Sequence, residues 1–422
     1  MLISLEPLET IQETAVDSSM APPAPPAASD DDKAKKAAEK ARRKAEFEAQ
    51  GGAPQKKQLS KAERRAQQEK ARSTKEAKKN PKKPPPKPTI VTTHEVGILS
   101  HMTPSTQSTP EAEGIPAPMQ TLGTAYASGE YDGANDRCRA LLKAVRESVA
   151  DYEPPENAAC ARDLDSKLRK WAEYLEKCRA PTASTLAALK RLRLVVSTLP
   201  PETSSADARA VIESECDRFV EERVDLAVRE IARRGAAKIR DGDVVVAYGF
   251  ADAVEALFRE AAESVNFEVV VVDAAPSFSG RRLLNALYAK QIRTTYVRLT
   301  AAAPEVERAT LVVLGADAVF SNGAVLARAG AFAVAALAKR RHVPVVVTCE
   351  AYKCHDRVRL DAVDANELFE VPALDKEDPP LKHLTYDITP SSYVSAVATE
   401  HGLLPPSAVA ALIRELAEKE TA

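Results

Sequence analysis

The feature that most constrains the fold is a change of hydrophobic period at Asp241-Gly242-Asp243. Beyond this turn, short runs rich in Val and Thr alternate with longer helical stretches. The runs are 244–249, 267–274, 293–299, 311–320 and 344–353, and the helical stretches are 251–264, 280–290 and 324–341. Apolar strands that alternate with helices are typical of a parallel sheet covered on both faces. We therefore predict a Rossmann-like α/β domain over 241–422, with a further strand at 385–388 and a closing helix at 407–419.

The stretch that precedes this turn follows a helical period instead. Leu164, Leu168, Trp171 and Leu175 recur at spacings of four, three and four, which places them on one face of a helix. A second helix is expected to start at Pro181, and a long third helix near Ser205. We predict an all-α domain of antiparallel helices over 120–240.

The first 119 residues have a composition that cannot form a core. Between Lys33 and Lys87 there are 20 Lys/Arg and 6 Asp/Glu, a local charge of +14, so the rest of this chain of net charge −2 carries −16. Such a segment buries too little apolar surface to offset its ordering entropy, and we predict a disordered, basic and Pro-rich tail over 1–119. Clustered Lys/Arg favour contact with RNA or ribosomes, but a solubilising tail without a specific partner fits equally well.

Composition and motifs exclude several classes of protein. No apolar run reaches the ~18 residues that span a bilayer, and the N-terminus lacks the pattern of a secretory signal. Six cysteines without a Cys-x-x-Cys pair indicate reduced thiols, so we predict a cytosolic protein that does not contact membranes. Cys349, Cys354 and His355 lack a fourth ligand, and we expect no metal. No Gly-x-Gly-x-x-Gly follows the first strand and no Gly-Lys-Ser/Thr occurs, so no cofactor is expected.

Ligands of open α/β sheets bind beyond the carboxyl ends of the strands. Asp317 and Asn322-Gly323 follow such an end, and they would project into the crevice there. The alternative is structural: Asp317 would cap a turn, and Asn322-Gly323 would supply a positive φ. The sequence leaves both interpretations open.

Several longer motifs follow one another from residue 178 onward. They are CRAPTAS (178–184), VVVVDAAPSFSGRRLLNAL (269–287), LGADAVFSNGAVLARAGAFAVAALA (314–338), VPVVVTCEAYKCHDRV (343–358), NEL (366–368), YDITP (386–390) and TEHGLLPPSAV (399–409). Together they resemble the regulatory-subunit family of the eukaryotic guanine nucleotide exchange factor called initiation factor 2B. Within that family, the long basic N-terminal extension is most similar to those of delta subunits.

The resemblance implies a regulatory subunit without catalytic residues. Its implied partners are the beta subunit most directly, then the alpha, gamma and epsilon subunits, in a decamer whose exchange chemistry belongs to epsilon. The helical domain would face the alpha subunit of initiation factor 2 and would sense the phosphorylation by which stress kinases control translation.

The resemblance and the charge pattern together suggest three groups of site residues. Arg179, Thr182, Ser184, Lys190 and Arg191 are the candidate contact with the phosphorylated factor, because a phosphoserine needs Arg/Lys donors or a helix N-terminus. The competing interpretation is a solvated helix face. A vestigial crevice would contain Asp317, Asn322 and Gly323, and an assembly motif would contain Tyr386, Asp387, Thr389 and Pro390.

The same fold also resembles that of isomerases acting on methylthioribose 1-phosphate or ribose 1,5-bisphosphate. Asp317 matches the Asp of their Gly-Ala-Asp motif. Their Cys after the first strand is absent from Val246–Phe250, and their Asn-Lys pair is Ala327-Arg328 here. Where many members of the wider family have Ser-Arg-Pro, this chain has Ala274-Ala275-Pro276, without the Arg. A proton shuttle that lacks one of its two partners argues against isomerase activity, which is the alternative function.

Overall fold

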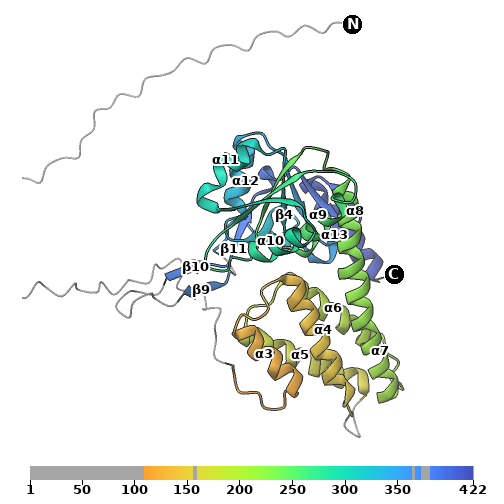
Figure 1. Cartoon of the computed structure of the whole chain (residues 1–422). Coiled ribbons are helices and arrows are strands. Elements are labelled where there is room, and N and C mark those ends of the chain that lie inside the picture. Colours follow the sequence, from red (N-terminus) through yellow and green to blue (C-terminus); the bar gives the residue numbers. More distant parts are fainter. Residues whose placement is uncertain (1–108, 155–158, 364–365, 372–380, 422) are drawn as a thin grey trace, which may run out of the picture. The chain divides into compact units, whose positions relative to one another are not determined.

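The computed structural model describes residues 109–421, apart from 155–158, 364–365 and 372–380 (Figure 1). The predicted disordered tail (1–119) lies almost entirely outside the described residues, so its disorder and its contact with RNA or ribosomes stay predictions. Within the described residues a helical region precedes a parallel sheet, as predicted. No helix in this part of the chain is both long enough and apolar enough to cross a membrane.

The helical region confirms the predicted helical period. Leu164, Leu168, Trp171 and Leu175 share one face of a helix and are between 0% and 6% exposed. Burying an apolar side chain of this size stabilises a fold by about 1.5–3 kcal/mol. The helices are α3 (Ala117–Ala127), α4 (Ala134–Ala150), α5 (Cys160–Cys178) and α6 (Ala183–Ser197).

One long helical segment connects this region to the sheet region (Figure 1). It consists of α7 (Ser205–Arg218), the π-helix η1 (Phe219–Leu226) and α8 (Ala227–Ala236), which follow one another without a break. The sequence predicted the long helix but not its π-helical middle, where the buried residues Phe219 and Val224 are five positions apart. The ring of Phe219 meets that of Tyr352, from the sheet region, edge-on at 5.4 Å.

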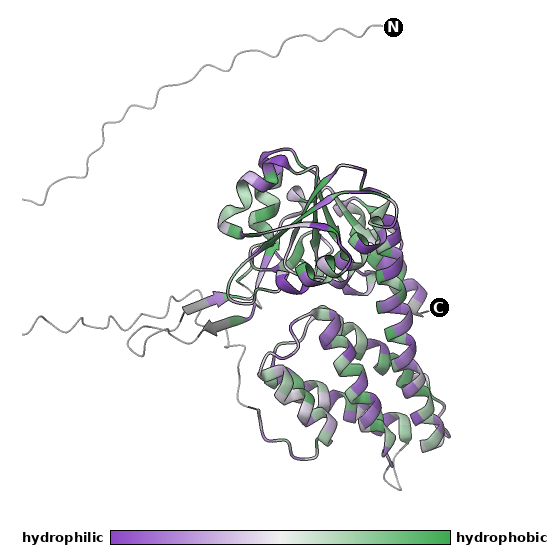
Figure 2. Ribbon diagram, in the orientation of Figure 1, coloured by the Kyte–Doolittle hydropathy of each residue, from purple (hydrophilic) through white to green (hydrophobic). Residues whose placement is uncertain are grey.

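The main sheet has seven strands in the order β13-β12-β7-β4-β1-β2-β3, parallel except for β13. Its strands are β1 (Val244–Tyr248), β2 (Glu268–Asp273), β3 (Arg293–Arg298), β4 (Leu311–Gly315), β7 (Val345–Thr348), β12 (Ala396–Thr399) and β13 (Gly402–Leu404). The residues 269–272 of β2 are 0% exposed, and Figure 2 shows hydrophobic residues concentrated on the strands. The strands β1, β2, β3, β4 and β7 confirm the prediction, whereas β12 and β13 were not predicted.

Helices cover the main sheet, and short 3-10 turns join several elements. The helices are α9 (Asp252–Ala261), α10 (Gly280–Ala289), α11 (Ala302–Arg308), α12 (Ala331–Arg340) and α13 (Val409–Thr421). The 3-10 turns are η2 (Leu299–Ala301), η3 (Ala351–Lys353), η4 (Ser391–Tyr393) and η5 (Pro406–Ala408). The predicted closing helix at 407–419 is confirmed by α13.

A second, four-stranded sheet corrects three of the predictions. It contains β5 (Ala318–Phe320), β6 (Val325–Arg328), β8 (Cys354–His355) and β11 (Tyr386–Thr389), and a separate hairpin pairs β9 (Leu368–Val371) with β10 (Leu381–Leu384). The predicted strand 311–320 is therefore two strands that belong to different sheets. The predicted helix 324–341 begins as β6, and the predicted final strand at 385–388 pairs with β6 instead of joining the main sheet.

The order of the main sheet fixes where a crevice can form. The chain leaves β1 toward β2 on one side and reaches β4 on the other, so β1 lies at the switch point of the topology. Ligand sites of open α/β sheets lie outside the carboxyl ends of strands at such a point. Gly330, at the start of α12, has a φ of +111°, and a Cβ there would collide with the Tyr248 hydroxyl at the end of β1.

Candidate functional site

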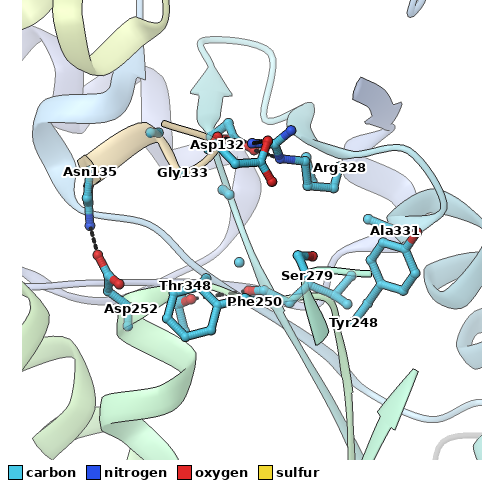
Figure 3. Close-up of a pocket in the computed structure, with 18 of the residues that line it drawn as sticks. Asp132, Gly133, Asn135, Tyr248, Phe250, Asp252, Ser279, Arg328, Ala331 and Thr348 are labelled. Atoms are coloured by element: carbon cyan, nitrogen blue, oxygen red, sulfur yellow. Dashed lines mark hydrogen bonds and ion pairs between the residues drawn. The ribbon is translucent and has the colours of Figure 1, made fainter. Parts of the chain in front are cut away.

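A crevice opens at the carboxyl ends of β1, β4 and β7, with a cavity volume of about 190 Å³. Its other wall is the segment 132–136, which includes the first residues of α4 in the helical region. A second cavity of about 150 Å³ adjoins it and shares Asp132, Tyr248, Ser279 and Arg328. Figure 3 shows side chains from both regions around the crevice.

Arg328 is the central cation of the crevice. Its guanidinium lies 2.7 Å from the Asp132 carboxylate and 3.9 Å from that of Asp317, and it stacks over the Tyr386 ring at 5.0 Å. Burial raises the pKa of the Asp317 carboxyl, and Arg328 and Lys353 oppose that rise. Asp317 therefore lines the crevice, but it lies beside a cation that Asp132 already neutralises.

Asn135 anchors a second polar cluster at the base of the crevice. Its amide donates to the carboxylates of Glu350 at 2.7 Å and of Asp252 at 3.1 Å, the latter drawn in Figure 3, and it accepts from the Tyr352 hydroxyl at 2.7 Å. Lys353 lies 2.6 Å from Glu350. Burial alone would raise the pKa of Glu350, but Lys353 and Asn135 outweigh it and lower that pKa. The same pairing raises the pKa of Lys353 to about 12.

The cation at the rim of the crevice, Arg282, also has carboxylate partners. Arg282 lies 2.8 Å from Asp136 and 3.6 Å from Asp252, and its guanidinium covers the Phe250 ring at 3.9 Å. Each of the three crevice cations therefore has a carboxylate of this chain as its partner. Because a phosphate would have to displace those carboxylates, the arrangement is better suited to holding the two regions together than to binding an anion.

The CRAPTAS motif is built into the same contact between the regions. Arg179 is 6% exposed, and its guanidinium holds the Glu367 carboxylate through Nη2 at 2.7 Å and Nε at 3.1 Å. Arg137 reaches the same carboxylate at 3.3 Å. Thr182 caps α6 through a reciprocal bond with Thr185.

The predicted contact surface for a phosphorylated factor therefore needs a correction. Arg179, Thr182 and Ser184 are between 0% and 8% exposed, because they bond within the chain, and the Ser184 hydroxyl donates to the carbonyl of Ala134 at 2.7 Å. Lys190 and Arg191 lie further along α6 and line a different groove. Arg191 is bound to Glu215 at 2.7 Å, and Lys190 is exposed. A contact of these two residues with a partner stays a prediction.

Asn322 and Gly323 form the turn between β5 and β6 and do not line the crevice. Gly323 has a φ of +75°, and the Asn322 side chain accepts from Ala324 N at 3.2 Å and donates to Arg359 O at 3.0 Å. A Cβ on Gly323 would lie 2.7 Å from the carbonyl oxygen of Pro406. The structural interpretation of this pair is thus correct, and its assignment to the crevice is wrong.

The predicted assembly motif lies on β11 and just after it. Tyr386 and Thr389 are 5% and 1% exposed, whereas Pro390 is exposed. Asp387 accepts from Gly330 N at 2.7 Å and Phe332 N at 3.0 Å, at the start of α12. These contacts give Tyr386, Asp387 and Thr389 a role inside the chain, and a role in assembly stays a prediction.

The sequence did not single out the residues that close the crevice. Asp132 and Asn135 precede or begin α4, Arg137 is one turn further, and their partners lie about 200 residues away. The cluster of acids before α4 and the NEL motif were the available signals.

In the described ranges no group of three His, Cys, Asp or Glu could hold a metal, and all six cysteines, which fall in those ranges, are free thiols.

A helical region, a parallel sheet and a crevice between them define a fold class that initiation factor 2 subunits share with sugar-phosphate isomerases. Residues 130–406 match the model of the Initiation factor 2 subunit family. The chain is 31% identical over 345 residues to the Translation initiation factor eIF2B subunit delta of Schizosaccharomyces pombe, covering 76% of this chain and 73% of that protein. The chain therefore belongs to the Initiation factor 2 subunit family, and the predicted resemblance to delta subunits is confirmed.

Two further comparisons bear on fold and chemistry. A chain in the crystal structure of the tetrameric eIF2B-beta2-delta2 complex from C. thermophilum matches with a TM-score of 0.66 and 28% identity, covering 72% of this chain and 97% of that one. A ribose 1,5-bisphosphate isomerase from Haloferax volcanii is 28% identical over 306 residues, which is 71% of this chain and 92% of that protein.

Glu367→Gln should destabilise the protein by about 3–5 kcal/mol, because it leaves the buried Arg179 and Arg137 without their counter-charge. Urea denaturation of both proteins measures the difference. The matched control is Glu147→Gln, whose carboxylate is 51% exposed and 3.9 Å from Lys143, and whose loss should barely move the midpoint. A double-mutant cycle with Arg179→Met should give a coupling of about 1–3 kcal/mol. Additive effects would contradict the assigned ion pair.

Asp387 should make stability depend on pH. Burial raises its pKa from 3.8 to about 6, although the N–H groups of Gly330 and Phe332 favour the ionised form. Because the folded state binds this proton more tightly than the unfolded state, stability should fall as pH rises from about 4 to 6 and level off above that. Asp387→Asn keeps an acceptor oxygen but removes the titration. The difference in urea midpoint between the two proteins should therefore change across that window, and a constant difference would exclude the effect.

Proposed function

We propose that this chain is a regulatory, non-catalytic subunit of the guanine nucleotide exchange factor for initiation factor 2. The observation that carries the proposal is the similarity to a delta subunit at 31% identity across 73% of that protein. The matching solved chain comes from a complex of beta and delta subunits, which supports a beta subunit as the direct partner. The alpha, gamma and epsilon subunits follow by family membership, as does a place in the cytosol.

The paired charges of the crevice support the non-catalytic part of the proposal. Arg328, Lys353 and Arg282 are each bound to carboxylates of the chain itself. At the end of β1 stands Tyr248, whose hydroxyl donates to the carbonyl of Ala329, where the isomerases have a thiol. Asp317 therefore lacks the thiol that would share with it the proton transfer between adjacent sugar carbons.

Sensing of the phosphorylated alpha subunit of initiation factor 2 would use the exposed cations of α6. Lys190 is exposed, and Arg191 is partly buried and bound to Glu215, 24 residues along the chain. A phosphoserine carries close to two negative charges at neutral pH and is bound by such cations. The buried Arg179 is not part of this surface, which leaves Lys190 as the residue to test.

Lys190→Glu should weaken the inhibition of exchange by phosphorylated factor 2, raising the half-inhibitory concentration about tenfold, which corresponds to ~1.4 kcal/mol. GDP release would be measured on complexes reconstituted with the other four subunits, at several ratios of phosphorylated to unphosphorylated factor. Lys290→Glu is the matched control, since this exposed lysine lies at the far end of α10. Equal inhibition of the two variants and the unchanged complex would exclude Lys190 from the contact, and loss of assembly would be seen in the mass of the complex.

The alternative function, a sugar-phosphate isomerase, has a separate test. Incubation of the purified chain with methylthioribose 1-phosphate or with ribose 1,5-bisphosphate should give no ketose product, because the second proton carrier is missing. The reaction would be followed by NMR against the enzyme from Haloferax volcanii as a positive control. Turnover that disappears on Asp317→Asn would overturn the non-catalytic assignment.

A further inference from the structure

A groove with its own set of lining residues lies between the helical region and the sheet region. Its walls are α6, the π-helix η1 and α13, its floor is the segment 351–356, and its cavity volume is about 500 Å³. No residue of this groove lines the crevice. It is therefore a separate place for a ligand.

Apolar side chains line the bottom of the groove at helical spacing. On α6 they are Ala183, Leu186 and Ala187, at positions i, i+3 and i+4, and Leu186 remains 38% exposed. Ile413, Leu416 and Ala417 repeat the same spacing on α13. Alanine at such positions lets another helix approach closely, because side chains of a third helix can pack into the groove between these two. The edge-on rings of Phe219 and Tyr352 complete the floor.

The rim of the groove is basic. Its cations are Lys190, Arg191, Arg223 and Arg414, and the one carboxylate that lines it, Asp356, is bound to His355 at 3.0 Å. Among the described residues no carboxylate pairs with Arg223 or Arg414, whereas the crevice cations all have one. Within the described residues, Arg223 and Arg414 thus stand beside an apolar floor without an ion-pair partner.

We propose that this groove binds an acidic amphipathic helix of a partner protein. A helix laid into a hydrophobic groove contributes apolar anchors at i, i+3, i+4 and i+7, and its outward charges meet the rim. Acidic residues on that helix would pair with Arg223 on one side and with Arg414 on the other. The apolar floor distinguishes this occupant from a phosphate-bearing loop, which would need donors at the centre of the groove and not only at its edge.

The groove shares Lys190 and Arg191 with the surface in the proposed function, so its test uses other residues. The probe is a fluorescein-labelled peptide of about 18 residues with Leu at i, i+3, i+4 and i+7 and Glu at most other positions. Two comparison peptides have Lys in place of Glu, or Ser in place of Leu. Fluorescence anisotropy with the purified full-length chain gives the dissociation constants.

The acidic amphipathic peptide should bind, and Arg223→Glu with Arg414→Glu should weaken it about tenfold or more. Leu186→Ser should also weaken binding, although it leaves every charge in place. Arg229→Glu is the matched control, because this exposed arginine lies on α8 outside the groove, and it should leave binding unchanged. Circular dichroism verifies that the variants are folded.

Three results would overturn the proposal. The first is equal binding of the acidic and the basic peptide. The second is an unchanged dissociation constant of the acidic peptide when Arg223→Glu and Arg414→Glu are introduced. The third is tighter binding of a phosphoserine peptide without Leu anchors, which would assign the groove to a phosphorylated loop. None of these results depends on nucleotide exchange, so the proposal and the proposed function can fail separately.

Discussion

The position of the helical region depends on one buried carboxylate. Glu367 directly precedes β9 of the sheet region. Two guanidinium groups of the helical region bind it: that of Arg137, in α4, and that of Arg179, at the end of α5. Removing three charges from water is expensive, so such a cluster persists only where hydrogen bonds satisfy its members. Arg179 also donates to Tyr131 O at 3.0 Å and Arg137 to Ala180 O at 2.6 Å, whereas the buried Nε of Arg137 has no partner within the described residues.

The state of the crevice follows from this anchor. Holding the segment 132–136 against the strand ends brings Asp132 to Arg328 and Asn135 to Glu350. The charged side chains of the crevice are therefore engaged in contacts between two parts of the same chain. Shared architecture with an isomerase does not by itself transfer the activity, because function resides in the side chains of the site and not in the fold.

The sequence predicted what depends on local periodicity and missed what depends on distant partners. Leu164 and Leu168 identified their helix, and the apolar run 269–272 identified its strand. Val325–Arg328 was assigned to a helix because its strand partner, Tyr386–Thr389, lies about 60 residues later in the chain. Arg179 was expected to be exposed because arginine usually is, and the glutamate that buries it is 188 residues away.

Ion pairing divides the basic residues into two kinds: those bound to carboxylates of the chain and those available to a partner. Sequence alone placed Arg179, Lys190 and Arg191 on one surface, since they are close in number and equal in sign. Arg179 forms an ion pair with Glu367, and Arg191 forms one with Glu215, both within the chain. Cations without a carboxylate in the described part of the chain, such as Arg223 and Arg414, keep an unbalanced field around an apolar groove. A cation without an ion-pair partner beside exposed apolar surface favours a ligand that supplies both opposite charge and apolar anchors. We therefore expect a partner of this subunit to bind where such cations lie.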